Sequence, residues 1–480
     1  MLRRLTLAAA VAAASCHWAM AETLPVSARS DLLSVYEQAA LNNADLAAAR
    51  AEFNALKERV PQAKAGLLPN LSGGIVSTDN QSKVNTDQGR MNAGRSGLSY
   101  QASLNQPLFR IDRWYQLQAA EALNEQAALS LSATEQQLIL QSAEHYFAVL
   151  RAQDNLAATK AEEAAFKRQL DQANERFEVG LSDKTDVLEA QAGFDAARAS
   201  RITAERQVDD ALEALNSLTN TRYNALEGIR HSLPILAPTP TDASAWVDTA
   251  ATQNLNLKAS FYAVEAAEET LRQRKAGHAP TLDAVAQYKR GDNDALGFSN
   301  SAQGPGYRSD AEQRSIGLQL NIPLYSGGAV RSQVRESTER LTQAEQQRES
   351  LRRAVVENTR TLFRAVNTDV ETIQARRQSI ISTQSALEAT EIGYQVGTRN
   401  IVDVLNAQRQ LYNAVRNYNN ARYDYILNNL RLKQVAGTLS PDDLAALADH
   451  LKPDYNPDKD FLPPDLAKAA EESLKALKNL

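Results

Sequence analysis

The side chains that most often carry out catalysis are scattered along this chain. His145, His231, His278 and His450 are far apart in the sequence and form no metal-ligand spacing, and no nucleophile-elbow motif is present. The single cysteine, Cys16, lies near the N-terminus. We therefore expect no catalytic site, no cofactor and no bound metal. We expect the functional residues to be charged side chains and turn residues, which long secondary-structure elements hold in place.

The composition is that of a folded chain without a nucleic-acid partner. The residues are 43% hydrophobic and 23% charged, which is ordinary for a folded protein. A chain of 480 residues is too large for one small core. The net charge of −6 provides no basic field that could hold a phosphate backbone.

Residues 1–21 have the features of a secretory signal peptide. Arg3 and Arg4 precede an apolar run, and Ala19-Met20-Ala21 forms a small-residue cleavage site. Cys16 lies inside this segment, so the mature chain would have no disulfide. In the alternative, Cys16 is the lipidated first residue of the mature chain, although no Leu precedes it at the expected place. No later stretch approaches the roughly 18 to 20 apolar residues of a membrane-spanning helix.

The chain contains an internal duplication with a period of about 211 to 217 residues. The segment FEVGLSDKTDVLEAQ (177–191) returns as YQVGTRNIVDVLNAQ (394–408), and Pro107-Leu108-Phe109 returns as Pro323-Leu324-Tyr325. This pattern predicts two structural repeats, 22–230 and 246–438. A linker, 231–245, joins them, and a tail, 439–480, follows; both are expected at mid-height and are called equatorial here.

Each repeat contains a segment too long for a globular domain. Residues 111–179 include no Gly or Pro, and a helix over this range would be about 100 Å long. The second repeat predicts a matching helix over 329–396. Apolar residues recur at sevens, which indicates a coiled-coil seam. The seam comprises Val149, Leu156, Leu170 and Phe177 in the first repeat, and Val366, Ile373, Ile380, Leu387 and Tyr394 in the second.

The long helices are expected to end in tip turns at Gly180 and Gly397, where a positive φ favours glycine. Return helices are predicted over 183–219 and 400–436, and each is only about 55 Å long. Single helices over 30–64 and 244–275 are expected to stack on the return helices and make up the difference in length.

Before each long helix the hydrophobic period changes to two, as in Leu98-Ser99-Tyr100 and Ile316-Gly317-Leu318. This alternation predicts strands over about 68–78, 97–108, 281–289 and 314–324, with the length of tilted transmembrane strands. Long polar loops are expected over 78–96 and 289–313. For any one strand the alternative is a soluble half-buried sheet. Four strands cannot close a barrel in lipid. Several copies would therefore share one barrel of eight, twelve or sixteen strands. The predicted fold class is mainly α with a transmembrane β part.

These segments resemble the TolC family of outer-membrane efflux proteins over nearly the whole mature chain. The resemblance is carried by VGLSDKTDVLEAQ and VGTRNIVDVLNAQ, by NQPLF and NIPLY, and by ARYDYILNNLRLKQVAGTLSPDDL. It implies a homotrimer with one twelve-stranded barrel in the outer membrane of a Gram-negative bacterium and a helical tunnel in the periplasm. It also implies a periplasmic adaptor (membrane fusion protein) and an inner-membrane RND or ABC transporter as partners. The expected function is the exit duct of a tripartite efflux pump, of type I secretion, or of both.

The resemblance gives roles to the two tips. The residues that would meet the adaptor are Val179, Gly180, Leu181, Ser182, Val396, Gly397 and Thr398. Asp403 begins a return helix, where the helix dipole favours a carboxylate. In a trimer, three copies of Asp403 would form an entrance ring that favours cations. Relatives often carry a second Asp where this chain has Asn406, so we expect a weaker ring.

Four further residues near the tips are expected to keep the entrance narrow. The resemblance implies links from Asp186 to Tyr394 and from Thr185 to Arg399, which hold one hairpin against its neighbour. Opening would be an outward shear of the hairpin over 363–436. The alternative is that these are ordinary polar side chains, which contact water at the tips and have no role in closing the entrance.

A soluble periplasmic coiled-coil adaptor is the alternative from another functional class. Such an adaptor has one helical hairpin flanked by compact β domains. This chain predicts two hairpins, with amphipathic strands at the end opposite the tips, which favours the channel.

Overall fold

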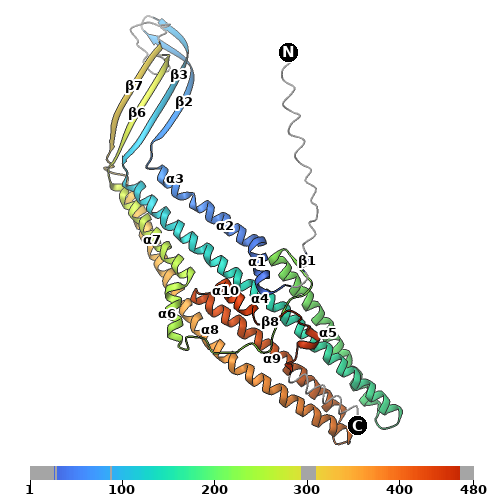
Figure 1. The fold of residues 1–480 in the computed structure, drawn as a ribbon. Helices are drawn as coiled ribbons and strands as arrows, with labels where there is room; N and C mark the ends of the chain where they lie inside the picture. Colours follow the sequence, from blue (N-terminus) through green and yellow to red (C-terminus); the bar gives the residue numbers. More distant parts are fainter. Residues whose placement is uncertain (1–25, 28–29, 87–88, 293–309, 465–480) are drawn as a thin grey trace, which may run out of the picture.

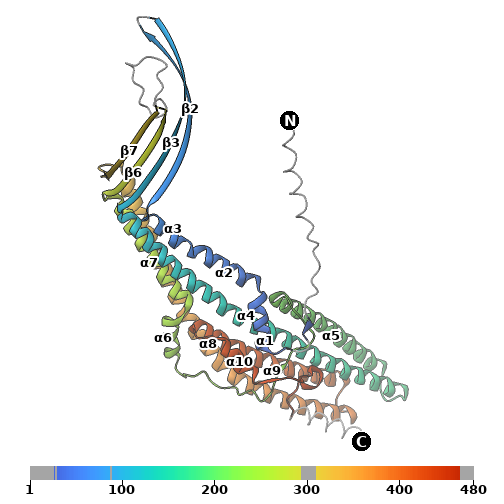
Figure 2. The same cartoon turned by 45° about the horizontal axis from the view of Figure 1, so that its top comes forward.

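The structure, a computed structural model, describes residues 26–27, 30–86, 89–292 and 310–464. The predicted signal peptide, Cys16 and the end of the predicted tail lie outside these residues. A four-stranded sheet forms one end of the long molecule, and helices extend from it to the tips at the other end (Figure 1). Viewed after rotation, the sheet is a curved, open layer that continues into the helices (Figure 2).

The sheet is antiparallel throughout. Its strands are β2 (Asn70–Thr86), β3 (Gly89–Phe109), β6 (Thr281–Asp292) and β7 (Asp310–Asn321), in the order β2-β3-β6-β7. Large apolar side chains remain exposed on this single chain, among them Leu71, Ile75, Ile316, Leu318 and Leu320. The strands β2 and β7 are the two edges.

The loop predicted over 78–96 is wrong, because β2 and β3 stay paired up to Thr86 and Gly89. Gly, Ser and Asn in this stretch give no apolar alternation, but a backbone ladder does not require one. Likewise β6 extends to Asp292 and β7 begins at Asp310, so part of the loop predicted over 289–313 is strand and residues 293–309 lie outside the described range. The predicted strand 314–324 ends early, at Asn321.

Two helical hairpins extend from the sheet. The first consists of α4 (Ile111–Glu178) and α5 (Lys184–Thr219), and the second of α8 (Ala329–Gln395) and α9 (Ile401–Ala436). The long helices were predicted over 111–179 and 329–396, and the return helices over 183–219 and 400–436. No helix in the described part of the chain combines the length and hydrophobicity needed to cross a membrane.

The shorter helices are interrupted where single helices were predicted. Residues 30–64 form α1 (Leu32–Asn42), α2 (Ala44–Lys57) and α3 (Arg59–Ala65), and residues 244–275 belong to α6 (Ala243–Gln253) and α7 (Leu255–Lys275). An asparagine causes each main break by capping the next helix, since Asn43 Oδ1 accepts from Leu46 N and Asn254 Oδ1 from Leu257 N. Their amide groups donate to the last turns of α5 and α9, which fixes the stacked helix ends.

The largest apolar core lies at mid-height, where the equatorial segments cover α4 and α9. These segments include β1 (Val26–Ser27), β4 (Arg222–Tyr223), β5 (Gly228–Ile229), α10 (Pro441–Ala448), β8 (Leu451–Lys452) and α11 (Pro457–Asp460). The β5 and β8 strands pair, which ties the end of the first repeat, just before the linker, to the tail. All five seam residues predicted on α8 are buried. Phe177, predicted on the α4 seam, is 45% exposed and was misplaced.

Candidate functional site

The two tip turns have the same backbone conformation. Gly180 has φ +76° and Gly397 has φ +78°, and the amide after each glycine donates back to the preceding helix. Val179, Leu181 and Val396 are each 69% exposed. These three of the predicted docking residues therefore present apolar side chains at the ends of both hairpins, whereas Ser182 is half-buried.

Above the turns, an apolar cluster packs one hairpin against the other. Phe166 of α4 and Ala197 of α5 meet Leu387 and Tyr394 of α8, together with Leu405 and its neighbours on α9. Gly193 of α5 makes room for the Phe166 ring within the first hairpin, because a Cβ there would lie 2.8 Å from Phe166 Cδ1, and it would lie 3.6 Å from Leu405 Cδ1 of the second hairpin. The two hairpins are thus held together near the tips by small residues and close apolar contacts.

Asp186 and Tyr394 face each other across the hairpins. Burial, and then the negative charge of Asp186, raise the pKa of Tyr394. Burial, and then the nearby Asp183, raise the pKa of Asp186. In the described part of the chain, Tyr394 Oη is buried without a hydrogen-bond partner. The two residues are neighbours in the described part of the chain, but no hydrogen bond joins them there.

Thr185 and Arg399 are not brought together within one chain. Both residues are exposed, and Arg399 forms an ion pair with Asp403 of its own hairpin, with 3.9 Å between Nη1 and Oδ2. Asp403 also completes a capping box, in which its amide donates to Asn400 Oδ1 at 2.8 Å. Asn406 is exposed on the next turn of α9.

Sequence reasoning missed Arg176, which lies against Tyr394. Its guanidinium carbon is 4.9 Å from the centroid of the Tyr394 ring. Arg176 is in the last turn of α4, and Tyr394 is in the last turn of α8. A basic residue in a final helical turn is favoured by the dipole, and this was the only signal in the sequence.

A second polar cluster, also missed, lies at mid-height around Asp154. Tyr423 Oη of α9 donates to Asp154 Oδ2 at 2.7 Å, and Tyr455 Oη of the tail binds the other oxygen. Burial raises the pKa of Asp154 to about 6, while the two tyrosine hydrogen bonds and Arg422 act in the opposite direction. This carboxylate joins α4, α9 and the tail.

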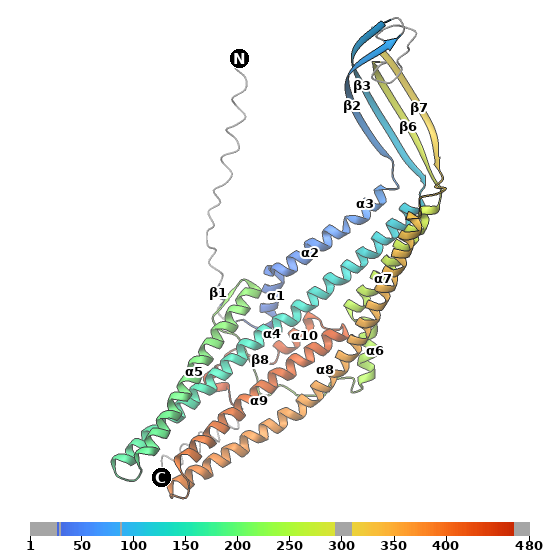
Figure 3. The ribbon, with the colours of Figure 1, turned by 180° about the vertical axis from the view of Figure 1, so that it is seen from behind.

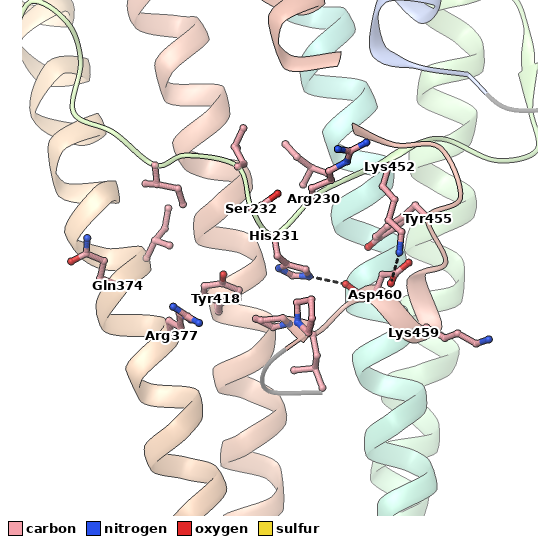
Figure 4. Close-up of a pocket in the computed structure, with 17 residues that line it drawn as sticks. Arg230, His231, Ser232, Gln374, Arg377, Tyr418, Lys452, Tyr455, Lys459 and Asp460 are labelled. Atoms are coloured by element: carbon pink, nitrogen blue, oxygen red, sulfur yellow. Dashed lines mark hydrogen bonds and ion pairs between the residues drawn. The ribbon is translucent and has the colours of Figure 1, made fainter. Parts of the chain in front are cut away.

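Next to this cluster, a pocket of about 850 Å³ lies between the linker, the tail and the α8 and α9 helices (Figure 4). Arg422 donates to His231 Nδ1 at 3.0 Å. Arginine only donates, so Nε2 carries the His231 proton and donates to the Asp460 carbonyl at 2.8 Å. The described residues contain no group of side chains arranged to hold a metal ion. These contacts anchor the tail and give no catalytic arrangement.

Comparison with known proteins places this architecture in one family. The family model described as "Outer membrane efflux protein" matches residues 35–221 and 246–438. Outer membrane protein TolC of Escherichia coli (strain K12) is 37% identical over 424 residues, covering 88% of this chain and 85% of that protein. The alkaline protease secretion protein AprF of Pseudomonas aeruginosa is 29% identical over 426 residues, covering 87% of this chain and 86% of AprF.

The fold agrees with a solved outer-membrane protein. The crystal structure of VceC from Vibrio cholerae superposes with a TM-score of 0.71 at 17% identity, over 85% of this chain and 96% of VceC. The alternative of a soluble periplasmic adaptor is not supported by these relatives. The family model covers both helical hairpins, and the chain belongs to the outer membrane efflux protein family.

Proposed function

We propose that three copies of this outer-membrane exit duct share one twelve-stranded barrel, which continues into a helical tunnel in the periplasm. The observation that carries the proposal is the open four-stranded sheet, with β2 and β7 as unpaired edges and large apolar side chains exposed. Unpaired backbone groups are not tolerated in lipid, so the edges must pair with other copies. Three copies give twelve strands, the number that family resemblance implies.

The sides of the helical half support association of copies. The helices α5 and α8 lie at opposite sides of the lower half (Figure 3). Glu213 on α5 and Arg364 on α8 are both exposed, and they lie about 44 Å and about 46 Å above the tips of their hairpins. Exposed Ile202 on α5 and Ile381 on α8 lie lower, about 27 Å and about 21 Å above the tips. Opposite charges at matching heights, with exposed apolar side chains below them, suit contact between α5 of one copy and α8 of the next.

The same proposal covers the domain organisation. Residues 22–230 and 246–438 form two duplicated repeats, 231–245 is the equatorial linker, and 439–480 is the equatorial tail. Support comes from matching order, since two strands, a long helix and a shorter helix occur twice. The asparagine caps at Asn43 and Asn254 also match.

In the proposed mechanism, the tips contact a periplasmic adaptor and an inner-membrane RND or ABC transporter. The exposed apolar residues Val179, Leu181 and Val396 suit such docking. Asp403 and Asn406 form the entrance ring, and Asp186 and Tyr394 hold the hairpins together. Because Thr185 and Arg399 do not meet within one chain, their link joins neighbouring copies. Outward movement of α8 and α9 opens the duct.

Planar-bilayer recording tests both the duct and its gate. The wild-type protein should insert as a channel of low conductance, and Arg399→Ala combined with Tyr394→Phe should raise the conductance. Arg340→Ala serves as the control, because Arg340 is 68% exposed and, among the described residues, forms its ion pair with Glu336 of its own helix. Equal conductance of the double variant and the control would exclude the gate. Absence of any channel, or release of the protein from membranes without detergent, would exclude the duct itself.

A further inference from the structure

We infer that Arg176 is a gate-positioning residue, and that it holds the second hairpin closed by binding the face of the Tyr394 ring. This inference rests on the proposed gate. Arg176 belongs to α4 of the first hairpin and Tyr394 to α8 of the second, so their contact crosses the boundary that opening must separate.

The geometry is that of a cation–π contact. The guanidinium carbon lies 4.9 Å from the ring centroid, inside the roughly 6 Å range of this interaction. Tyr394 is only 6% exposed and Arg176 is half-buried, so water screens the contact weakly. The negative face of the aromatic ring then faces the delocalised charge of arginine.

No ion pair competes with the ring for Arg176 in the described part of the chain. Asp186 of α5 interacts with it through charge, since the positive charge of Arg176 lowers the pKa of Asp186 against the larger effect of burial. At the tips, this is also the one cation–π contact between hairpins among the described residues. The Lys167 contact with Phe194, at 5.8 Å, stays within the first hairpin.

The stabilisation that the ring contact gives the closed state is partly offset by the burial of polar atoms. Arg176 Nε and Tyr394 Oη are both buried without hydrogen-bond partners among the described residues. Arg176 Nε would regain water when the hairpins separate, which favours opening, whereas loss of the ring contact opposes it. A partner that pulls the second hairpin outward therefore has to overcome only the difference between these two effects.

The test compares Arg176→Gln with Lys167→Gln in planar bilayers. Arg176→Gln should raise the open probability about two- to fivefold, because it removes a contact made only in the closed state. Lys167→Gln removes a cation from an aromatic ring within one hairpin and should change nothing. Arg176→Lys keeps the charge without the planar group and should give a smaller rise.

Two backgrounds distinguish the ring contact from a general structural effect. The rise caused by Arg176→Gln should persist with Tyr394→Phe, which keeps the ring, and should disappear with Tyr394→Leu. Within each background, Arg176→Gln and Lys167→Gln should have the same melting temperature. Equal behaviour of Arg176→Gln and Lys167→Gln, or an undiminished effect in the Leu background, would overturn the inference. If the combined Arg399→Ala and Tyr394→Phe variant also conducts like wild type, the proposed gate has failed as well.

Discussion

Tyr423 of α9 donates a hydrogen bond of 2.7 Å to Asp154 of α4, deep in the equatorial part of the molecule. The second carboxylate oxygen binds Tyr455 of the tail. Asp154 is 3% exposed, so water does not compensate its charge. One carboxylate therefore connects both hairpins to the tail.

The Asp154 carboxyl makes stability depend on pH. Burial raises its pKa from 3.8 to about 6, against the two tyrosine hydrogen bonds and Arg422. The folded chain then binds this proton more tightly than the unfolded chain does. The resulting stabilisation is complete below about pH 4 and is lost as the pH rises through about 6, and it amounts to about 3 kcal/mol.

Asp154→Asn should remove this dependence, because the amide stays neutral at every pH. We expect the melting temperature of the variant to exceed that of the wild type more at pH 7.5 than at pH 4.5. Circular dichroism of the helices gives the measurement. Asp424→Asn is the matched control, since Asp424 is 51% exposed and pairs with Arg151 on the surface. A pH profile of Asp154→Asn that parallels the wild type would contradict the prediction.

Gly228 sets the position of the tail. A Cβ at this residue would overlap the Tyr455 ring, which cannot retreat without leaving Asp154. Gly228→Ala should therefore displace the tail, cost about 1–3 kcal/mol, and make residues near Tyr455 accessible to protease.

Gly317→Ala provides the comparison for this change. Gly317 has no atom within 4 Å of an added Cβ and no positive φ. Limited proteolysis of both variants, followed by mass spectrometry, measures the effect. If the tail is equally resistant to protease in Gly228→Ala and Gly317→Ala, Tyr455 accommodates the added methyl group.

Arg110 joins the two repeats where strands become helices. Its Nε and Nη2 donate to the two oxygens of Asp283, at 3.1 and 2.9 Å. Arg110→Lys cannot keep both bonds, and Arg110→Ala leaves the buried Asp283 without its cation. We expect destabilisation by about 1–3 kcal/mol for Ala and less for Lys.

Trp114, one turn along α4, reports unfolding at this junction through its fluorescence in a Trp246→Phe background. A second change, Asp283→Asn, should recover part of the stability lost in Arg110→Ala, because it removes the uncompensated charge. If Asp283→Asn gives no recovery, the Arg110 effect does not come from this ion pair.

Hydrophobic periodicity determined much of the fold in advance, and local chemistry explains the differences. The α8 seam was predictable because Val366 and its partners at sevens are all buried. Phe177 was misplaced although its repeat equivalent on α8, Tyr394, is buried, so seven-residue spacing alone does not decide which side chain is covered at the end of a hairpin. The breaks at Asn43 and Asn254 carried a signal in the strong capping preference of asparagine.

The polar contacts were harder to predict than the seam. Asp154 gives no sequence signal, because Tyr423 and Tyr455 are 269 and 301 residues away from it. Arg176 and Tyr394 likewise belong to different repeats, and only the packing of the hairpins brings them together. Tip glycines were predictable from local backbone needs, whereas contacts between hairpins depend on the whole fold.

Asp403 has two roles that one substitution can separate. Its side chain accepts from Asn400 N in the capping box, and its charge belongs to the proposed entrance ring. Asp403→Asn keeps an oxygen for the cap but removes the charge, so the fold should persist with little change in melting temperature.

In bilayers with a salt gradient, Asp403→Asn should move the reversal potential toward zero, because three fewer negative charges would face the permeating ions. Asn406→Asp should move it the other way by restoring a second carboxylate on the next turn of α9. Asp171→Asn is the control, since Asp171 is exposed and pairs with Lys167 of its own helix. Opposite shifts for the two tip variants, with none for the control, would place both side chains at the narrow entrance. If all three variants share the wild-type potential, Asp403 serves its helix alone.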